Sequence, residues 1–191
     1  MASPDFYEST QLSLYHKTSS PERLREKHRP SLIRRVSDLL SFWFTQLFDS
    51  EMCDTNAHGP LSSSNTAHSQ TRLSRSIESF LITTCSVAEI TESELLYAVV
   101  LIEDLVRQQI NPSTSKPPLI FRENLGTLIL VSIILSLKFL RDRTYKNSCW
   151  AKLHSMDLKD LNKSERIFCQ YLNHHILVGE ERILRIMKKI S

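Results

Sequence analysis

The residue best suited to covalent chemistry is Cys149, which is followed by Trp150 and then by His154. A thiol close to a histidine can lose its proton and act as a nucleophile. The sequence has no other sign of an enzyme: there is no Gly-rich phosphate loop, no Ser-His-Asp order with elbow glycines and no paired acid motif. We therefore expect Cys149 to pack in a loop, and we expect the protein not to be an enzyme.

Metal chemistry is not indicated either. The cysteines occur singly, without a Cys-x-x-Cys pair, and the pair His174-His175 has no nearby partner residues. Unpaired thiols without an apolar N-terminal segment are typical of an intracellular protein. We expect no metal, no cofactor and a location in the cytoplasm, the nucleus or both. The four cysteines are Cys53, Cys85, Cys149 and Cys169.

The elements that would position any site are built around an apolar run at residues 125–140. A surface helix would carry a polar stripe, and this run has none. Its small residues, Gly126, Ser132 and Ser136, would let neighbouring helices approach closely. The alternative is a transmembrane helix, but the uncharged stretch covers only residues 124–137, and a bilayer needs roughly 20 apolar residues. We therefore predict a central core helix and no transmembrane segment.

Four further helices are predicted around this core helix. Thr91 followed by Glu94 forms a capping box that starts a helix, and Asp157 is a suitable N-cap for another. The last helix begins with acidic residues and ends with basic ones, an order that complements the helix dipole. With the core helix, the expected helices cover residues 71–84, 91–109, 122–141, 157–173 and 180–190.

One more helix, an amphipathic one, is predicted at about residues 31–48. Its apolar residues recur at spacings of three and four, and Pro30 suits a helix start. The chain on either side is rich in Ser, Pro and charge and can bury little apolar area. We expect residues 1–70 to form a mostly flexible N-terminal arm that carries this helix, and residues 71–191 to form the folded domain.

The composition agrees with this organisation. The 191 residues are 41% hydrophobic and 24% charged, with only three glycines, which favours a globular and mainly helical protein. The net charge of +3 is too small to indicate nucleic-acid binding without a local basic patch.

Three ordered motifs in the second half of the chain resemble the cyclin box. Residues 136–142 read Ser-Leu-Lys-Phe-Leu-Arg-Asp, where that family has Ala-Ser-Lys-Phe-Leu-Asp-Asp. Residues 145–152 contain a Tyr-x-Asn-x-x-Trp-Ala-Lys loop, and residues 158–168 read Leu-x-x-Leu-Asn-x-x-Glu-x-x-Phe. The pattern is most similar to single-box cyclins of the fungal PHO/Pcl type and their cyclin P/U relatives, and more distantly to cyclin Y. The resemblance covers about residues 76–190.

This resemblance implies a fold and a function. The fold is all-α: a single five-helix cyclin box with an N-terminal extension that carries one amphipathic helix. The function is that of a non-catalytic subunit that binds and activates a cyclin-dependent protein kinase.

The resemblance also implies a set of partner-binding residues. Lys138 and Glu165 match the Lys and Glu with which cyclins hold the kinase chain near its movable C-helix. Lys offers three hydrogen-bond donors and Glu accepts, so together they can cap backbone groups of a partner. Without the motifs, Lys138 would merely end a helix favourably and Glu165 would be a solvated charge. The full implied set is Lys138, Glu165, Phe139, Leu140, Tyr145 and Trp150.

The chain also departs from the family pattern. The Asp-Arg of the family's second helix is Glu103-Asp104 here, so this position has lost its cation. Arg72 and Arg75, on the first helix of the domain, are the candidates to pair with Glu103. By its sequence, the chain therefore resembles a divergent member of this family.

Short patterns indicate three candidate phosphorylation sites. Residues 34–37 read Arg-Arg-Val-Ser, which fits the preference of basophilic kinases for Ser37. Ser3 and Ser20 each precede a proline, as proline-directed kinases prefer.

Two other functions remain as alternatives. A cyclin-fold transcription-associated factor would carry two boxes and a more basic surface. A scaffold protein would attach to a membrane surface through the helix at 31–48, which follows a basic segment at residues 17–35. We expect this helix to pack on the domain instead, because its polar face carries Ser, Asp and Gln rather than Lys.

Overall fold

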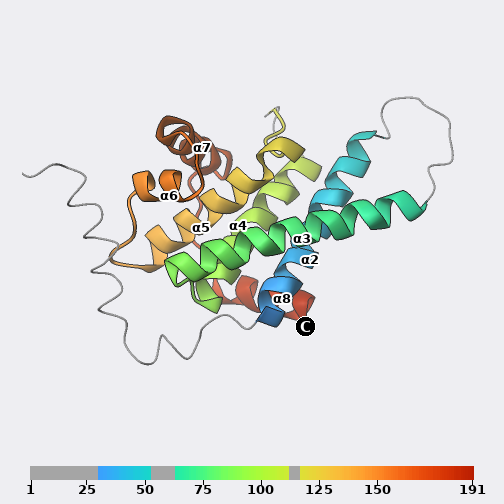
Figure 1. Cartoon of the computed structure of the whole chain (residues 1–191), viewed down its shortest axis with the longest axis horizontal. Helices are drawn as coiled ribbons and strands as arrows, with labels where there is room; N and C mark the ends of the chain where they lie inside the picture. Colours follow the sequence, from blue (N-terminus) through green and yellow to red (C-terminus); the bar gives the residue numbers. More distant parts are fainter. Residues whose placement is uncertain (1–29, 53–62, 112–116) are drawn as a thin grey trace, which may run out of the picture.

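The computed structural model describes residues 30–52, 63–111 and 117–191. In these ranges the regular structure is all helical, with no strand (Figure 1). This confirms the predicted all-α fold. The elements are α2 (Pro30–Met52), α3 (Ser63–Ala88), α4 (Glu92–Ile110), the 3-10 turn η1 (Arg122–Asn124), α5 (Leu125–Leu140), α6 (Asn147–Leu153), α7 (Leu158–Tyr171) and α8 (Glu180–Ile190).

The helices α4 and α5 form the centre of the bundle (Figure 1). Every residue of α5 from Leu128 to Leu137 is buried, as the missing polar stripe predicted. The sequence pattern of α4 predicted one inward face, yet this helix is buried all round from Glu94 to Glu103. The reason is that α4 contacts α2 and α8 as well as α5.

The predicted N-terminal helix is part of the same core. α2 packs on α3, α4 and α8, and the Arg35 guanidinium donates to the carbonyl of Ile190 at 3.2 Å. The apolar stripe that was considered for membrane attachment therefore lies inside the protein. The expected division between residues 70 and 71 falls inside α3. The core residues that α2 contributes are Ile33, Val36, Leu40, Phe44, Leu47 and Phe48.

Local signals located the starts of α4 and α7 correctly, whereas the helix expected at 71–84 is α3, which runs from Ser63 to Ala88. The Glu94 N–H donates to Thr91 Oγ1 at 3.3 Å and the Thr91 N–H donates to Glu94 Oε2 at 2.7 Å, which is the predicted capping box. Asp157 caps α7 by accepting from the N–H of Lys159 at 2.6 Å. The short helix α6 was expected to be a loop. Because it has only two turns, it lacks the periodic pattern from which longer helices are predicted.

One described stretch, Arg122–Leu140, is long and apolar enough to span a membrane by length and composition alone. Of its most apolar window, 61% is buried inside the protein. This burial is what a core helix of the bundle shows.

Candidate partner-binding site

The charged pair expected to contact a partner forms where α5, α6 and α7 meet. Lys138, in the last turn of α5, donates from Nζ to Glu165 Oε1 on α7 at 2.5 Å. Asn147, the first residue of α6, donates from Nδ2 to Glu165 Oε2 at 2.5 Å and to Asn162 Oδ1 at 2.7 Å. Folding therefore brings together one residue from each of the three sequence motifs: Lys138 from the first, Asn147 from the second and Glu165 from the third.

This network leaves both charges able to bind a further group. The side chains of Lys138 and Glu165 remain 37% and 18% exposed. The ammonium has three donors and gives one to Glu165, and each carboxylate oxygen can accept more than one hydrogen bond. Since Asn147 and Lys138 fix the carboxylate from two sides, its orientation is set before any partner arrives.

Two apolar side chains follow Lys138 at the end of α5 and are exposed. Phe139 and Leu140 are 44% and 45% exposed. Phe139 stacks on Tyr97 of α4 with ring centroids 5.5 Å apart. The Tyr97 hydroxyl donates to the carbonyl of Ile176 at 2.6 Å and accepts from the N–H of Val178 at 3.2 Å. The ring of Phe139 therefore packs on a tyrosine whose hydroxyl makes two hydrogen bonds, one as donor and one as acceptor.

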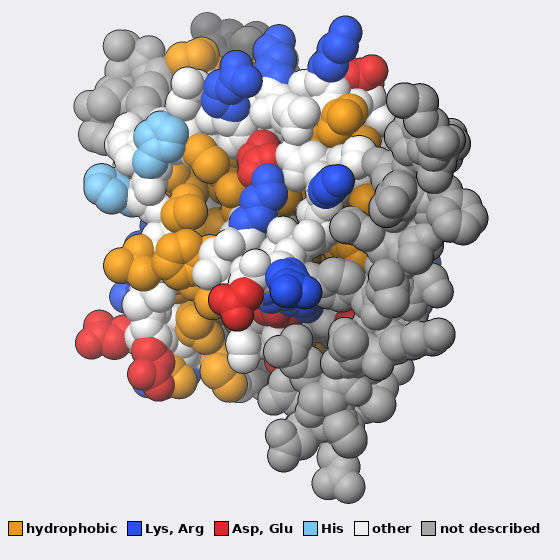
Figure 2. Space-filling model, turned by 90° about the vertical axis from the view of Figure 1, so that its left-hand side faces the viewer, with side chains coloured by type: hydrophobic (Ala, Val, Ile, Leu, Met, Phe, Trp, Pro, Cys, Tyr) orange, Lys and Arg blue, Asp and Glu red, His pale blue; other side chains and the backbone are white. Residues whose placement is uncertain are grey.

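The same part of the molecule offers a mixed surface to a partner. Figure 2 shows hydrophobic side chains gathered beside basic and acidic ones on the side of the molecule that lies to the left in Figure 1. Exposed apolar side chains with charged groups beside them resemble the apolar core and polar rim of protein interfaces.

Trp150 is not part of this surface, which corrects the expectation from sequence. Its side chain is 2% exposed, and it belongs to the core. Tyr145 is half-buried and meets Trp150 edge to face, with ring centroids 5.9 Å apart. Because residues 147–153 form the helix α6, the Trp150 side chain points into the core. It packs against Tyr145 there and is not available to contact a partner.

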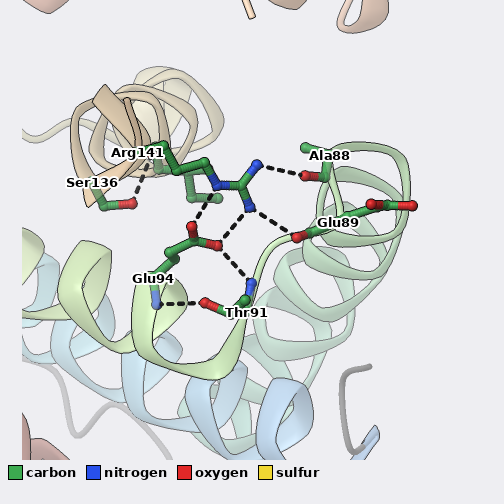
Figure 3. Close-up of polar contacts among 7 residues, drawn as sticks. Ala88, Glu89, Thr91, Glu94, Ser136 and Arg141 are labelled. Atoms are coloured by element: carbon green, nitrogen blue, oxygen red, sulfur yellow. Dashed lines mark hydrogen bonds and ion pairs between the residues drawn. The ribbon is translucent and has the colours of Figure 1, made fainter. Parts of the chain in front are cut away.

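The sequence did not reveal the role of Arg141, which follows the end of α5. Its guanidinium donates to both carboxylate oxygens of Glu94, at 2.5 and 2.7 Å, and both side chains are largely buried (Figure 3). Burial alone would disfavour the ionised form of Glu94, but hydrogen bonds and charge from Arg141, with the N–H of Thr91, hold the pKa of its carboxyl below the usual value.

Glu103 also has partners that the sequence did not predict. Lys189 of α8 donates to its Oε1 at 2.5 Å, and Arg107 donates to the same oxygen at 3.0 Å. Arg72 and Arg75, the expected partners, are exposed on α3 and make no ion pair with Glu103. Burial again disfavours the charge, but Lys189 and Arg107 lower the pKa of the Glu103 carboxyl. Its second oxygen is buried without a hydrogen bond.

The candidate phosphorylation sites fare differently. Ser37 is fully buried in α2, where its hydroxyl donates to the carbonyl of Ile33 at 2.8 Å. A kinase cannot reach this hydroxyl in the folded protein, so the prediction for Ser37 is wrong for the native state. Ser3 and Ser20 lie outside the described residues.

The residues considered for catalysis and metal binding do not assemble. His154 packs on the ring of Phe80 at 4.8 Å and approaches Thr84 Oγ1 at 3.4 Å, so it faces α3 and makes no hydrogen bond to Cys149. Cys85 is fully buried, and burial raises the pKa of its thiol to about 12. Among the described residues, no three His, Cys, Asp or Glu side chains lie together as metal ligands would.

Comparison with known proteins gives one match. The family model described as Cyclin matches residues 45–176, which include Lys138, Glu165 and the helices that carry them. Neither the curated proteins nor the solved structures contain a match to this chain.

Proposed function

The chain belongs to the cyclin family, whose members are generally non-catalytic regulators, and on this basis we propose that it binds and activates a cyclin-dependent protein kinase. The observation that carries the proposal is the pair formed by Lys138 and Glu165, at 2.5 Å, on a surface where Phe139 and Leu140 are exposed.

The physical role of this surface is to hold one conformation of the kinase. In protein kinases, the ATP-binding lysine pairs with a glutamate of the C-helix only when that helix is in its inner position. The exposed rings and aliphatic groups of Phe139 and Leu140 supply apolar area for such a helix. Lys138 and Glu165 can donate to and accept from backbone groups at its end. Binding therefore stabilises the inner position, and the protein adds no catalytic group of its own.

We further propose a single-box cyclin of the PHO/Pcl type, more distantly similar to cyclin Y, acting in the cytoplasm, the nucleus or both. Three motifs support this subtype: the Lys-Phe-Leu sequence at residues 138–140, the Tyr-x-Asn-x-x-Trp-Ala sequence at 145–151 and the Leu-x-x-Leu-Asn-x-x-Glu-x-x-Phe sequence at 158–168.

The test is a binding and activation assay with the full chain. Purified cyclin-dependent kinases are mixed one at a time with the wild-type protein, and dissociation constants and phosphate transfer to a peptide are measured. We expect at least one kinase to bind and to gain activity. The double variant Lys138→Ala, Glu165→Ala should lose both effects. The matched control is Lys188→Ala with Glu180→Ala, which changes two exposed charges of α8.

Other results would point to the other functions. If no kinase binds while the chain associates with transcription factors or sediments with anionic vesicles, the alternative assignments replace this one. If a kinase binds but its activity does not rise, the protein is a kinase-binding scaffold and not an activator.

A further inference from the structure

One residue, Arg141, joins the ends of three helices (Figure 3). At the end of α5 its backbone N–H donates to the carbonyl of Leu137 at 2.9 Å. At the start of α4 its guanidinium binds both oxygens of Glu94. At the end of α3 it donates to the carbonyls of Ala88, at 3.2 Å, and Glu89, at 2.9 Å. We call the Arg141 guanidinium with its partners Glu94, Ala88 and Glu89 the Arg141 clasp.

Each contact of the clasp satisfies a group that would otherwise lack a partner. The last carbonyls of a helix receive no hydrogen bond from within the helix. Ala88 and Glu89 lie at the end of α3, so their carbonyls need an outside donor. Glu89 has a φ of 48°, a left-handed conformation that glycine usually adopts at this position, so a donor to its carbonyl helps to hold the turn. Glu94 is buried, and a buried carboxylate needs paired donors.

The clasp and the ring stack of Phe139 act on the same segment. Glu94 and Tyr97 are three residues apart on α4, so they lie on one face of that helix. Glu94 holds Arg141 and Tyr97 holds Phe139. The segment from Lys138 to Arg141 is therefore fixed to α4 at two points, on either side of Leu140.

We propose that Arg141 is a positioning residue for the partner-binding surface. It acts through the end of α5, which it holds so that Lys138, Phe139 and Leu140 present one arrangement to the kinase. This proposal rests on the proposed function. Its basis in this chain is a charge change: where the similar family pattern has Asp, position 141 is an arginine whose side chain is 14% exposed and turned toward α3 and α4.

The physical expectation is a loss of order at the end of α5 when the clasp is opened. Without the guanidinium, Glu94 would keep only its capping-box contact with Thr91, and the carbonyls of Ala88 and Glu89 would lose their donor. The last turn of α5 would then populate several conformations. A partner that needs one of them must order the segment on binding, which weakens affinity.

The first experiment is a double-mutant cycle on kinase binding. Arg141→Ala and Lys138→Ala are measured singly and together, at a temperature at which all variants are folded, with a kinase that binds the wild-type chain. We expect Arg141→Ala to weaken binding about ten-fold, and much less when Lys138 is already Ala, because residues that act through one another are not additive. Arg141→Lys should recover little of the kinase affinity that Arg141→Ala loses, since an ammonium cannot form the two parallel hydrogen bonds to Glu94.

The matched control is Arg182→Ala. Arg182 of α8 also forms a partly buried ion pair with a carboxylate of α4, that of Asp104, but this pair joins α8 and not α5 to that helix. Its loss should lower the melting temperature without changing kinase affinity. If Arg141→Ala leaves affinity unchanged, or if its effect adds fully to that of Lys138→Ala, Arg141 is only structural and the proposal is overturned.

The second experiment needs no kinase, so it separates failure of this inference from failure of the proposed function. Amide hydrogen exchange is compared between the wild-type chain, Arg141→Lys and Arg182→Ala. We expect Arg141→Lys to speed exchange about ten-fold or more at residues 138–141 and 88–91, with α8 unchanged. Uniform acceleration over the whole chain would overturn the proposal. If no kinase binds the wild-type chain, the proposed function fails, and a positioning role of Arg141 for kinase binding fails with it. Faster amide exchange confined to residues 138–141 and 88–91 would still show that the clasp orders the end of α5.

Discussion

Lys138 and Glu165 already form an ion pair in the free chain, with the ammonium nitrogen 2.5 Å from a carboxylate oxygen. The two residues come from different helices, α5 and α7, and Asn147 of α6 binds the second carboxylate oxygen. The pair is therefore assembled by folding and not by the partner. Because it is partly exposed, it adds little to the stability of the fold.

Substitution of this pair should separate binding from stability. We expect Lys138→Ala or Glu165→Ala to weaken kinase affinity by about 2 kcal/mol or more, because one side of a charged contact is left unpaired in the interface. The free energy of unfolding should fall by only about 0.2–1 kcal/mol, as for exposed ion pairs. Titration calorimetry and thermal melting measure the two effects. Equal losses of both would make the pair structural, and unchanged affinity would place the interface on another face.

Ser136 should not tolerate a larger side chain. It is fully buried in α5, and its hydroxyl donates to the carbonyl of Ile133 at 2.8 Å. Ser136→Leu would overpack the core around the central helix α5, and the free energy of unfolding should fall by about 1–3 kcal/mol or more. The control Ser136→Ala keeps the volume small and should cost no more than about 1.5 kcal/mol. The melting temperature reports both, and a Leu variant that melts like the wild type would mean that this face is not packed.

Truncation can decide whether the chain divides, as the sequence suggested, into an arm at 1–70 and a domain at 71–191. A fragment of residues 71–191 lacks α2 and the start of α3, so the apolar surface that α2 covers would be open to water. Each buried side chain lost from the core costs about 1.5–3 kcal/mol. We therefore expect residues 30–191 to melt cooperatively and the shorter fragment to lose that transition. A cooperative melt of 71–191 would support the division at residue 70.

Acid should destabilise the protein through Glu94. The pKa of this carboxyl is held below its usual value in the folded state. Its contribution to stability is therefore present above the unfolded pKa and is lost as the pH falls through the folded pKa. We expect the difference in unfolding free energy between the wild type and Glu94→Gln to shrink from about pH 7 to about pH 3. Glu180→Gln, which removes an exposed carboxylate in the first turn of α8, serves as the control. If the difference in unfolding free energy stayed constant with pH, the contact between Arg141 and Glu94 would not depend on the charge of Glu94.

Ser37 should be phosphorylated only when the chain is unfolded. Its side chain is inaccessible in α2, although its sequence context suits a basophilic kinase. We expect such a kinase to label a peptide of residues 31–41 and not the folded protein, as measured by mass spectrometry. Stoichiometric labelling of the folded chain would show that α2 detaches from the core.

The sequence by itself determined the family and most of the helices, although it missed α6 and the start of α3. The apolar run of α5, the capping box of Thr91 and Glu94, and the Asp157 cap all depend on residues within a few positions of one another. Such signals are local, so they could be recognised without knowing how the helices pack. The three cyclin-like motifs are local in the same sense, and the family match covers them.

Only the tertiary structure decided which distant residues meet. Arg141 and Glu94 are 47 positions apart, and Lys189 and Glu103 are 86 apart. No helical period links such pairs, because their contact depends on the relative placement of whole helices. The same placement buries Trp150, whose position in its motif suggested a partner contact. Whether a charged or aromatic side chain faces the partner or the core is set by the packing of its helix, which its neighbours in sequence do not encode.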